Sequence, residues 1–192
     1  IYREEHARAR QQQHNEAVVE DAADDSGSKI EVTLIDGSRQ PLDRRRLQAI
    51  VNEACADLKD VEADAILRDT ERNLFDGVPE KDVSRMLVMS ARTLIEKQPD
   101  YSYTAARLLL DDMRTEALSF VYNRLTHATQ FEISSLYADY FDKYVKRAVD
   151  LELLDARLLE YDLNHLGKQL MAERDHQFTY LGLQTLYDRY FI

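Results

Sequence analysis

The stretch that decides the fold is residues 98–118, with the sequence QPDYSYTAARLLLDDMRTEAL. Pro99 ends any preceding helix, because proline cannot continue a helix and disfavours the helical conformation of the residue before it. Asp100 or Ser102 is expected to cap the next helix by accepting hydrogen bonds from its first N–H groups. Apolar residues then recur at helical spacing, at Tyr103, Ala106, Leu109, Leu110, Met113 and Ala117. This period predicts a helix in the core of a bundle.

The composition predicts a mostly helical protein. Only five glycines and three prolines occur among 192 residues, so few positions disfavour a helix. A formal net charge of −11 argues against a general nucleic-acid-binding protein, since binding phosphates needs a basic surface. No apolar run approaches the roughly 20 residues that span a membrane, and no signal peptide is recognisable, so we expect a cytoplasmic protein. The single cysteine, Cys55, excludes an intrachain disulfide and a cysteine-rich zinc site.

The first 28 residues are expected to lie outside the main fold. Residues 1–10 (IYREEHARAR) have the pattern of the end of a helix, with basic residues that suit a helix C-terminus. Residues 11–28 are polar, acidic and aperiodic, which is the composition of a linker. We therefore interpret the chain as part of a longer protein, in which residues 1–10 are the tail of a preceding domain.

A β-hairpin is predicted to follow the linker. Apolar and polar residues alternate over residues 29–35, which is the period of a half-buried strand. Asp36-Gly37 is a strong turn signal for a hairpin, and residues 39–42 are the predicted return strand. Pro41 confines this second strand to a sheet edge, because proline lacks the N–H that an inner strand donates.

Three helices are predicted between the hairpin and Pro99. The first runs over residues 43–58 from a cap at its first residue, and the third runs over residues 79–98. The second, residues 63–74, is expected to end with Gly77 as its left-handed C-cap residue. The predicted inward faces are Leu47, Ile50, Val51, Ala54 and Leu58 in the first helix and Val83, Met86, Leu87, Ser90, Leu94 and Ile95 in the third. Cys55 lies beside the first face and is interpreted as a buried structural thiol.

Aromatic residues become frequent in the last part of the chain. Residues 137–149 and 151–161 each have an amphipathic helical pattern, and residues 164–171 favour a short helix. Residues 175–180 are predicted to be extended, and residues 182–191 to be helical. No long linker separates this part from the bundle, so we expect the two to pack together.

Three strings in a fixed order resemble a known domain. They are DGS at residues 36–38, FDGV at residues 75–78 and PDYSYTAARL at residues 99–108. Together they resemble the ATP-cone of ribonucleotide reductases followed by the start of the class I large (alpha) subunit, and the resemblance covers about residues 29–192. A further similarity, to the segment that leads into the catalytic barrel of that family, rests on residues 173–175, Phe178, Tyr180 and Leu186.

The resemblance implies a mainly α fold and a division into domains. Residues 29–118 would be an ATP-cone-like domain, a helix bundle with a small β-hairpin or sheet as a lid. Residues 119–192 would be a helical N-terminal domain that leads toward the catalytic barrel. Residues 1–10 resemble the closing helix of another ATP-cone, which would make the described cone the second of two.

The same resemblance implies a function. The chain would be the regulatory and structural N-terminal region of a ribonucleoside-diphosphate reductase, whose catalytic barrel lies in another part of the protein. The parent enzyme would be a homo-oligomer of large subunits that works with a small radical-generating subunit. No catalytic residue is expected here, because the reaction of the family needs a thiyl-forming cysteine and a redox-active cysteine pair, and this chain has Cys55 alone.

Binding of ATP or dATP by a cone requires cations or helix N-termini near the phosphates, because a triphosphate carries about four negative charges. The family has a Lys-Arg pair immediately before the Asp-Gly of the hairpin, where this chain has Leu34 and Ile35. Glu80 replaces a small hydroxyl residue of the family, Ser84 a histidine and Thr115 a basic residue. We therefore predict a degenerate cone that binds neither ATP nor dATP.

Two positions keep the family pattern, Val32 and Arg46, and these remain the candidates for nucleotide contacts. The run of three arginines that ends at Arg46 is also typical of a solvated first helical turn, which is the interpretation we favour. No metal site is expected, because the spacing of His165 and His176 relative to nearby carboxylates fits no compact ligand motif. The tyrosines are interpreted as core and edge aromatics rather than as radical carriers.

Two other classes of protein are alternatives. A cone-containing transcriptional repressor would need about four cysteines in CxxC pairs and a basic surface for DNA, and this chain has neither. A stand-alone helical interaction module with no enzymatic parent would require the string matches to be chance.

Overall fold

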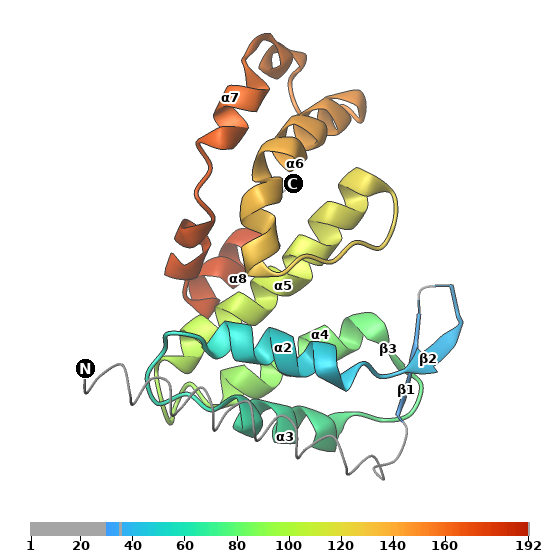
Figure 1. The fold of residues 1–192 in the computed structure, drawn as a ribbon, viewed down its shortest axis with the longest axis vertical. Coiled ribbons are helices and arrows are strands. Elements are labelled where there is room, and N and C mark those ends of the chain that lie inside the picture. Colours follow the sequence, from blue (N-terminus) through green and yellow to red (C-terminus); the bar gives the residue numbers. More distant parts are fainter. Residues whose placement is uncertain (1–29, 35, 192) are drawn as a thin grey trace, which may run out of the picture.

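A computed structural model describes residues 30–34 and 36–191, so the expectations for residues 1–28 and for Ile35 lie outside the described part of the chain. Figure 1 shows one group of helices beside a small sheet and a second group of helices above it. The long helix α5 runs from the first group into the second. The predicted mainly helical fold with a small sheet is confirmed.

The predicted hairpin is present. Strand β1 (Glu31–Thr33) pairs antiparallel with strand β2 (Arg39–Pro41), and β2 lies at the edge of the sheet as its proline requires. Gly37 has a φ of 82° in the turn, a left-handed conformation that glycine adopts without steric cost. The Asp-Gly signal therefore predicted the turn correctly.

A third strand, β3 (Val78–Pro79), was not predicted. It lies parallel to β1 on the side away from β2, with Val32 opposite Val78. Gly77 has a φ of 81° and donates its N–H to the carbonyl of Glu31 at 2.8 Å, which brings β3 against β1. The expectation that this glycine caps the preceding helix is wrong, because that helix ends four residues earlier and its C-cap, Leu74, is extended.

The helix bundle has the predicted order. Asp43 caps the first helix, since its Oδ1 accepts from the N–H of Arg46 at 2.9 Å. The predicted third helix begins as expected but ends five residues early, and residues 94–97 form turns before Pro99. The four helices are α2 (Arg44–Cys55), α3 (Ala63–Asn73), α4 (Glu80–Thr93) and α5 (Tyr101–Tyr122).

The first turn of α5 is capped differently from the prediction. Asp100 occupies the N-cap position, but its side chain accepts no hydrogen bond from the helix. Its carboxylate instead accepts from the N–H of Lys59 at 3.4 Å, and the Ser102 hydroxyl accepts from the N–H of Tyr180 at 3.3 Å. Both predicted capping groups therefore connect α5 to other segments.

Helix α5 is buried over a wider surface than the predicted stripe. The stripe residues Tyr103, Leu110 and Met113 are only half-buried, because α5 packs against α2, α4, α6 and α8 at once. The most buried residues of α5 are Tyr101, Thr104, Ala105, Ala106, Leu108, Leu109, Asp111 and Leu118.

The last part of the chain is helical, but two predictions for it are wrong. Residues 151–161 do not continue as a helix; they form turns and the exposed 3₁₀-helix η2 (Ala156–Glu160). The segment predicted to be extended begins within the 3₁₀-helix η3 (Ala172–Gln177). The α-helices are α6 (Gln130–Asp150), which starts with a capping box, α7 (Leu163–Lys168) and α8 (Tyr180–Arg189).

Helix α8 joins the two groups of helices. Its Leu183 is only 1% exposed and belongs to the same core cluster as buried residues of α2, α3, α4 and α5. The Tyr187 hydroxyl also donates to Glu116 of α5 at 2.7 Å. The prediction that the last part packs on the bundle is confirmed. None of the helices in the described part of the chain is both long and apolar enough to cross a membrane.

Candidate functional site

Val32 has a structural position in the sheet. Its side chain is 3% exposed and packs in a small apolar cluster with Val78 of β3 and Val83 of α4. This cluster fixes the hairpin over the first turn of α4. The residue that matches the family pattern is therefore explained by packing alone.

The tip of the hairpin carries an anion. Leu34 is half-buried and its N–H donates to the carbonyl of Ser38 at 2.9 Å, which closes the turn. Asp36 accepts from both the hydroxyl and the N–H of Ser38, at 2.6 and 2.9 Å, and these hydrogen bonds lower the pKa of its carboxyl group. The turn thus presents an apolar side chain and a carboxylate rather than cations.

The start of α4 is also acidic. Glu80 is the first residue of this helix, Asp82 lies in the same turn, and Ser84 follows one turn later. A helix N-terminus attracts anions through its free N–H groups and its dipole. Here Glu80 and Asp82 place carboxylates at that end, so a phosphate approaching it would meet negative charge.

Arg46 and Thr115 lie together, and His127 joins them. Nη2 of Arg46 lies 2.7 Å from Nδ1 of His127, and Oγ1 of Thr115 lies 3.1 Å from the same nitrogen. A guanidinium group can only donate, so Nδ1 must be the unprotonated acceptor. His127 keeps an exposed surface, yet partial burial of its ring and the charge of Arg46 lower its pKa to about 4. The ring is therefore neutral at pH 7.

Arg46 also faces a buried carboxylate. Its Nη2 lies 4.0 Å from Oδ2 of Asp111, and Nη2 of Arg114 lies 3.4 Å from the other oxygen. Burial raises the pKa of the Asp111 carboxyl group, and the charges of Arg114 and Arg46 oppose that rise. The charge of Arg46 is thus directed at partners within the fold.

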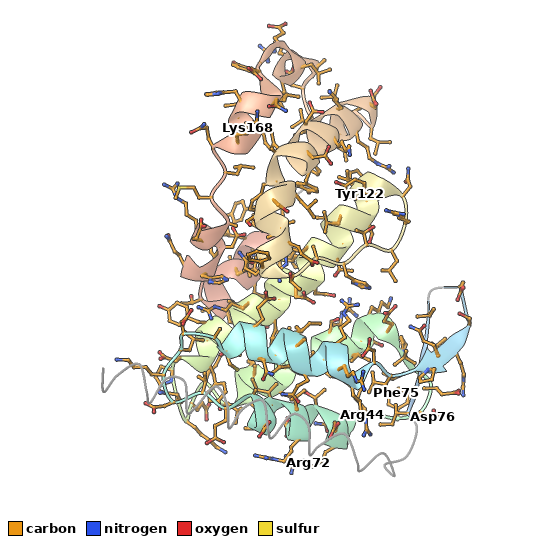
Figure 2. All side chains as sticks on the ribbon, in the orientation of Figure 1. Arg44, Arg72, Phe75, Asp76, Tyr122 and Lys168 are labelled. Atoms are coloured by element: carbon orange, nitrogen blue, oxygen red, sulfur yellow. The ribbon has the colours of Figure 1, made fainter. Side chains whose placement is uncertain are left out.

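Two other arginines near the sheet are also close to carboxylates. Nη1 of Arg39 lies 3.3 Å from Asp76 and 3.9 Å from Glu31, and Nε of Arg44 lies 3.9 Å from Glu71. Figure 2 labels Arg44 and Asp76 at the end of the bundle beside the sheet. These pairs are exposed, so each contributes little stability, but they reduce the positive potential available to a phosphate.

Comparison with known proteins identifies the domain that these residues belong to. Residues 30–116 match the family model of the ATP cone domain. This chain contains an ATP cone. The resemblance drawn from the three strings is confirmed.

The chain is also similar to larger proteins over both the cone and the helices that follow. It is 34% identical to the ribonucleoside-diphosphate reductase subunit alpha of Chlamydia muridarum over 192 residues, which cover all of this chain and 18% of that subunit. The subunit of the same name from Helicobacter pylori is 27% identical over 164 residues, 85% of this chain and 19% of the subunit. Ribonucleoside-diphosphate reductase 1 subunit alpha of Escherichia coli is 26% identical over 166 residues, which cover 84% of this chain and 20% of that subunit. The chain spans about a fifth of the length of these relatives and corresponds to their N-terminal region.

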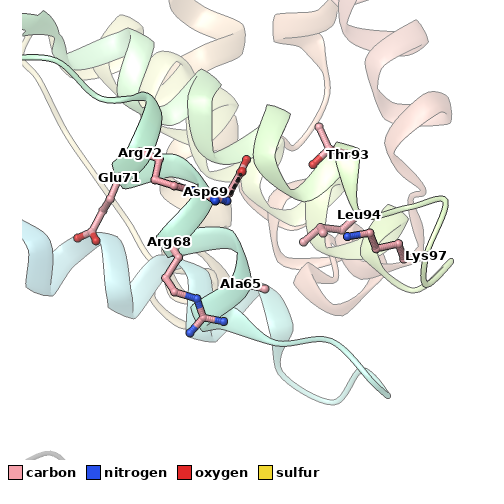
Figure 3. A pocket seen from close by; sticks show the side chains of 8 residues that line it. All are labelled: Ala65, Arg68, Asp69, Glu71, Arg72, Thr93, Leu94 and Lys97. Carbon is pink, nitrogen blue, oxygen red and sulfur yellow. Dashed lines mark hydrogen bonds and ion pairs between the residues drawn. The ribbon is translucent and has the colours of Figure 1, made fainter.

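Two cavities lie away from the described residues of the predicted nucleotide site. One of about 700 Å³ lies between α3 and the end of α4 (Figure 3), where Arg72 pairs with Asp69 at 2.9 Å. Another, of about 810 Å³, lies between α5, α6 and α8 and is rich in tyrosine. Among the described residues, neither is lined by Val32, Leu34, Arg46, Glu80, Ser84 or Thr115.

The cysteine and the tyrosines that were considered for catalysis pack or form hydrogen bonds within the fold. Cys55 is half-buried beside the cone core, and burial raises the pKa of its thiol. The Tyr122 hydroxyl donates to Asp139 at 2.8 Å, while the rings of Tyr140 and Tyr144 stack with their centroids 5.6 Å apart. Within residues 30–34 and 36–191, no three histidine, cysteine, aspartate or glutamate side chains come close enough together to hold a metal ion.

Sequence reasoning missed His127 as a member of the Arg46 cluster. This histidine lies 81 residues from Arg46 and 12 from Thr115, in the segment between α5 and α6. No local spacing brings these positions together, because their meeting depends on how α6 packs against the cone. Only the shared helix face of Asp111 and Thr115, four residues apart, could have been read from the sequence.

Proposed function

We propose that this chain is the N-terminal regulatory and structural region of a ribonucleoside-diphosphate reductase alpha subunit, and that its cone binds neither ATP nor dATP. The full-length protein would reduce ribonucleoside diphosphates in the cytoplasm, as a homo-oligomer of alpha subunits with a small radical-generating subunit. The similarity to alpha subunits from three bacterial genera supports the first part of the proposal. The alternative of a transcriptional repressor has no support in these relatives.

The observation that carries the second part is the cluster around Arg46. The one cation that keeps the family pattern is directed at Asp111 and His127, while the turn before it carries Leu34 in place of a cation. A charge-assisted hydrogen bond contributes about 1.5–3 kcal/mol. The family pair Lys-Arg is replaced by Leu34 and Ile35 in this chain. Loss of one such bond to phosphate from each of these two positions would cost about 3–6 kcal/mol, which weakens nucleotide binding about 10²- to 10⁴-fold.

A cone without nucleotide would still have a structural role. The core of the cone includes Leu183, which comes from α8 and lies outside the matched region. The cone therefore packs against the helices that follow it and would fix, relative to them, the point at which the predicted linker of residues 11–28 joins the fold. In this proposal the domain acts as a rigid spacer rather than as a nucleotide sensor.

Isothermal titration of this chain with ATP and with dATP tests the absence of binding. We expect no binding in the micromolar range for either nucleotide. The matched variant replaces Leu34 by lysine, Ile35 by arginine and Thr115 by lysine, which restores the cations of the family pattern. Binding by this variant alone would support the proposal, whereas micromolar binding by the unmodified chain would refute it.

A further inference from the structure

Four segments of the chain meet at a partly buried polar cluster. A small cavity of about 10 Å³ lies where α2, α5, α6 and η3 come together. Its polar lining consists of Glu53, Arg107, Asp111, Arg114, Gln130 and His176. The cluster lies between the cone and the helices that follow it, since Gln130 and His176 are outside the matched region.

Gln130 makes contacts with three of these segments. Gln130 is the first residue of α6, so its N–H has no carbonyl partner within the helix. Oε1 of Glu53 in α2 accepts from this N–H at 3.0 Å. Its side-chain amide donates to the carbonyl of Ala172 in η3 at 2.8 Å, and its Oε1 accepts from Nη1 of Arg114 in α5. One side chain and one N–H thus link the cone to both following segments.

Two donors in the cluster have no partner within the protein. Nε of Arg107 and Nε of Arg114 are both buried, and neither has a hydrogen-bond acceptor. Nη1 of Arg107 is used elsewhere, donating to the carbonyls of Ala54 and Ala56 at 3.2 and 2.6 Å. Buried N–H groups in native proteins are almost always satisfied, by protein or by ordered water.

The size and chemistry of the cavity identify its occupant. A volume of about 10 Å³ corresponds to roughly one water-sized probe. Water can accept from two N–H groups and donate to two oxygens, and the cavity offers two arginine donors and the carboxylates of Glu53 and Asp111. A halide ion is larger, can only accept, and would face both carboxylates.

We propose that a single water molecule binds in this cavity, accepts from Nε of Arg107 and Nε of Arg114, and holds the start of α6 and η3 against the cone. Burial and the charge of Arg107 lower the pKa of His176, which also lines the cavity.

A crystal structure of this chain tests the water site. We expect one density peak within about 2.7–3.2 Å of both Nε atoms. Crystals grown with bromide in place of chloride should show no anomalous peak there. An anomalous bromide peak or a cavity without density would overturn the proposal.

Hydrogen exchange tests whether the site holds the two parts together. In Arg107→Met, which removes one donor to the water but none of the hydrogen bonds described for Gln130, the Gln130 amide should exchange at least 10-fold faster than in the unmodified chain. The matched variant Arg85→Met removes an exposed arginine of α4 that pairs with Asp82 of its own helix at 3.3 Å, and should leave that rate unchanged. Equal rates for Gln130 in both variants would overturn the holding role. If Arg107→Met fails to fold, the crystal test on the unmodified chain still decides the site.

Discussion

Replacement of Leu183 by alanine should destabilise the whole chain, although this residue lies 67 positions beyond the matched cone region. Leu183 of α8 is 1% exposed and packs within the cone core. The change removes about three carbon groups, and at ~0.8 kcal/mol for each buried CH₂ the transfer contribution is about 2.4 kcal/mol. The cavity left behind adds to this loss, so we expect a decrease of about 3–5 kcal/mol in the free energy of unfolding.

Urea denaturation followed by circular dichroism measures this loss. Leu181→Ala is the matched control, because the same substitution two residues away removes a side chain that is 74% exposed. It should change stability by less than about 0.5 kcal/mol. In thermal unfolding, Leu183→Ala should lower the Tm by about 6–20 °C, given about 2–4 °C for each kcal/mol in a protein of this size. Equal effects of the two variants would refute the conclusion that α8 completes the cone core.

Two further predictions concern single side chains. Gly167→Ala should destabilise the chain by about 1–3 kcal/mol, because the added Cβ would lie 2.8 Å from the backbone of α6. Gly182→Ala should stabilise the chain by about 0.5–1 kcal/mol, because its Cβ has ordinary space and alanine favours a helix. Urea denaturation should therefore give changes in unfolding free energy of opposite sign for the two variants. The folded state lowers the pKa of His127 from 6.5 to about 4, so the unfolded chain binds a proton at this residue first as the pH falls. The stability that the neutral ring contributes is therefore present above about pH 6.5 and is lost between about pH 6.5 and 4. The stability advantage of the unmodified chain over His127→Asn should therefore shrink across that range in denaturation measured at several pH values, and an advantage that grows on acidification would contradict the assigned neutral ring.

The elements that sequence reasoning predicted correctly depend on local chemistry. Gly37 adopts a left-handed conformation in the hairpin turn, and Asp43 accepts from the first turn of α2. Pro79 immediately precedes α4, where a missing N–H costs nothing. Each of these signals acts within a few residues, so it can be interpreted without knowledge of the tertiary fold.

The errors arise where tertiary contacts decide the outcome. Strand β3 has two residues and no period, and it exists because Gly77 brings it beside β1. Residues 151–161 have an amphipathic period, but Leu151 and Leu153 remain 52% and 47% exposed, so no apolar face is buried to stabilise a helix. Asp100 was predicted to cap α5 and instead accepts from a loop that lies 41 residues away.

The candidate site shows the same limit. The resemblance singled out Arg46 and Thr115 as separate positions, and the structure places both beside His127. It said nothing of His127 or of Gln130, which lie outside the matched cone and reach it across 81 and 77 residues. Contacts made by a following domain are not encoded in a pattern derived from the cone itself.

The position of Arg46 connects the proposed loss of nucleotide binding with the packing of the following helices. A cation serves a phosphate only when its charge is not already compensated, and Arg46 faces both Asp111 and the acceptor nitrogen of His127. The second of these partners comes from the segment between α5 and α6, which leads directly into Gln130, where Glu53 and Arg114 bind the start of α6. Restoring cations in the hairpin alone would therefore leave Arg46 engaged. A nucleotide that used Arg46 would have to displace His127 from it.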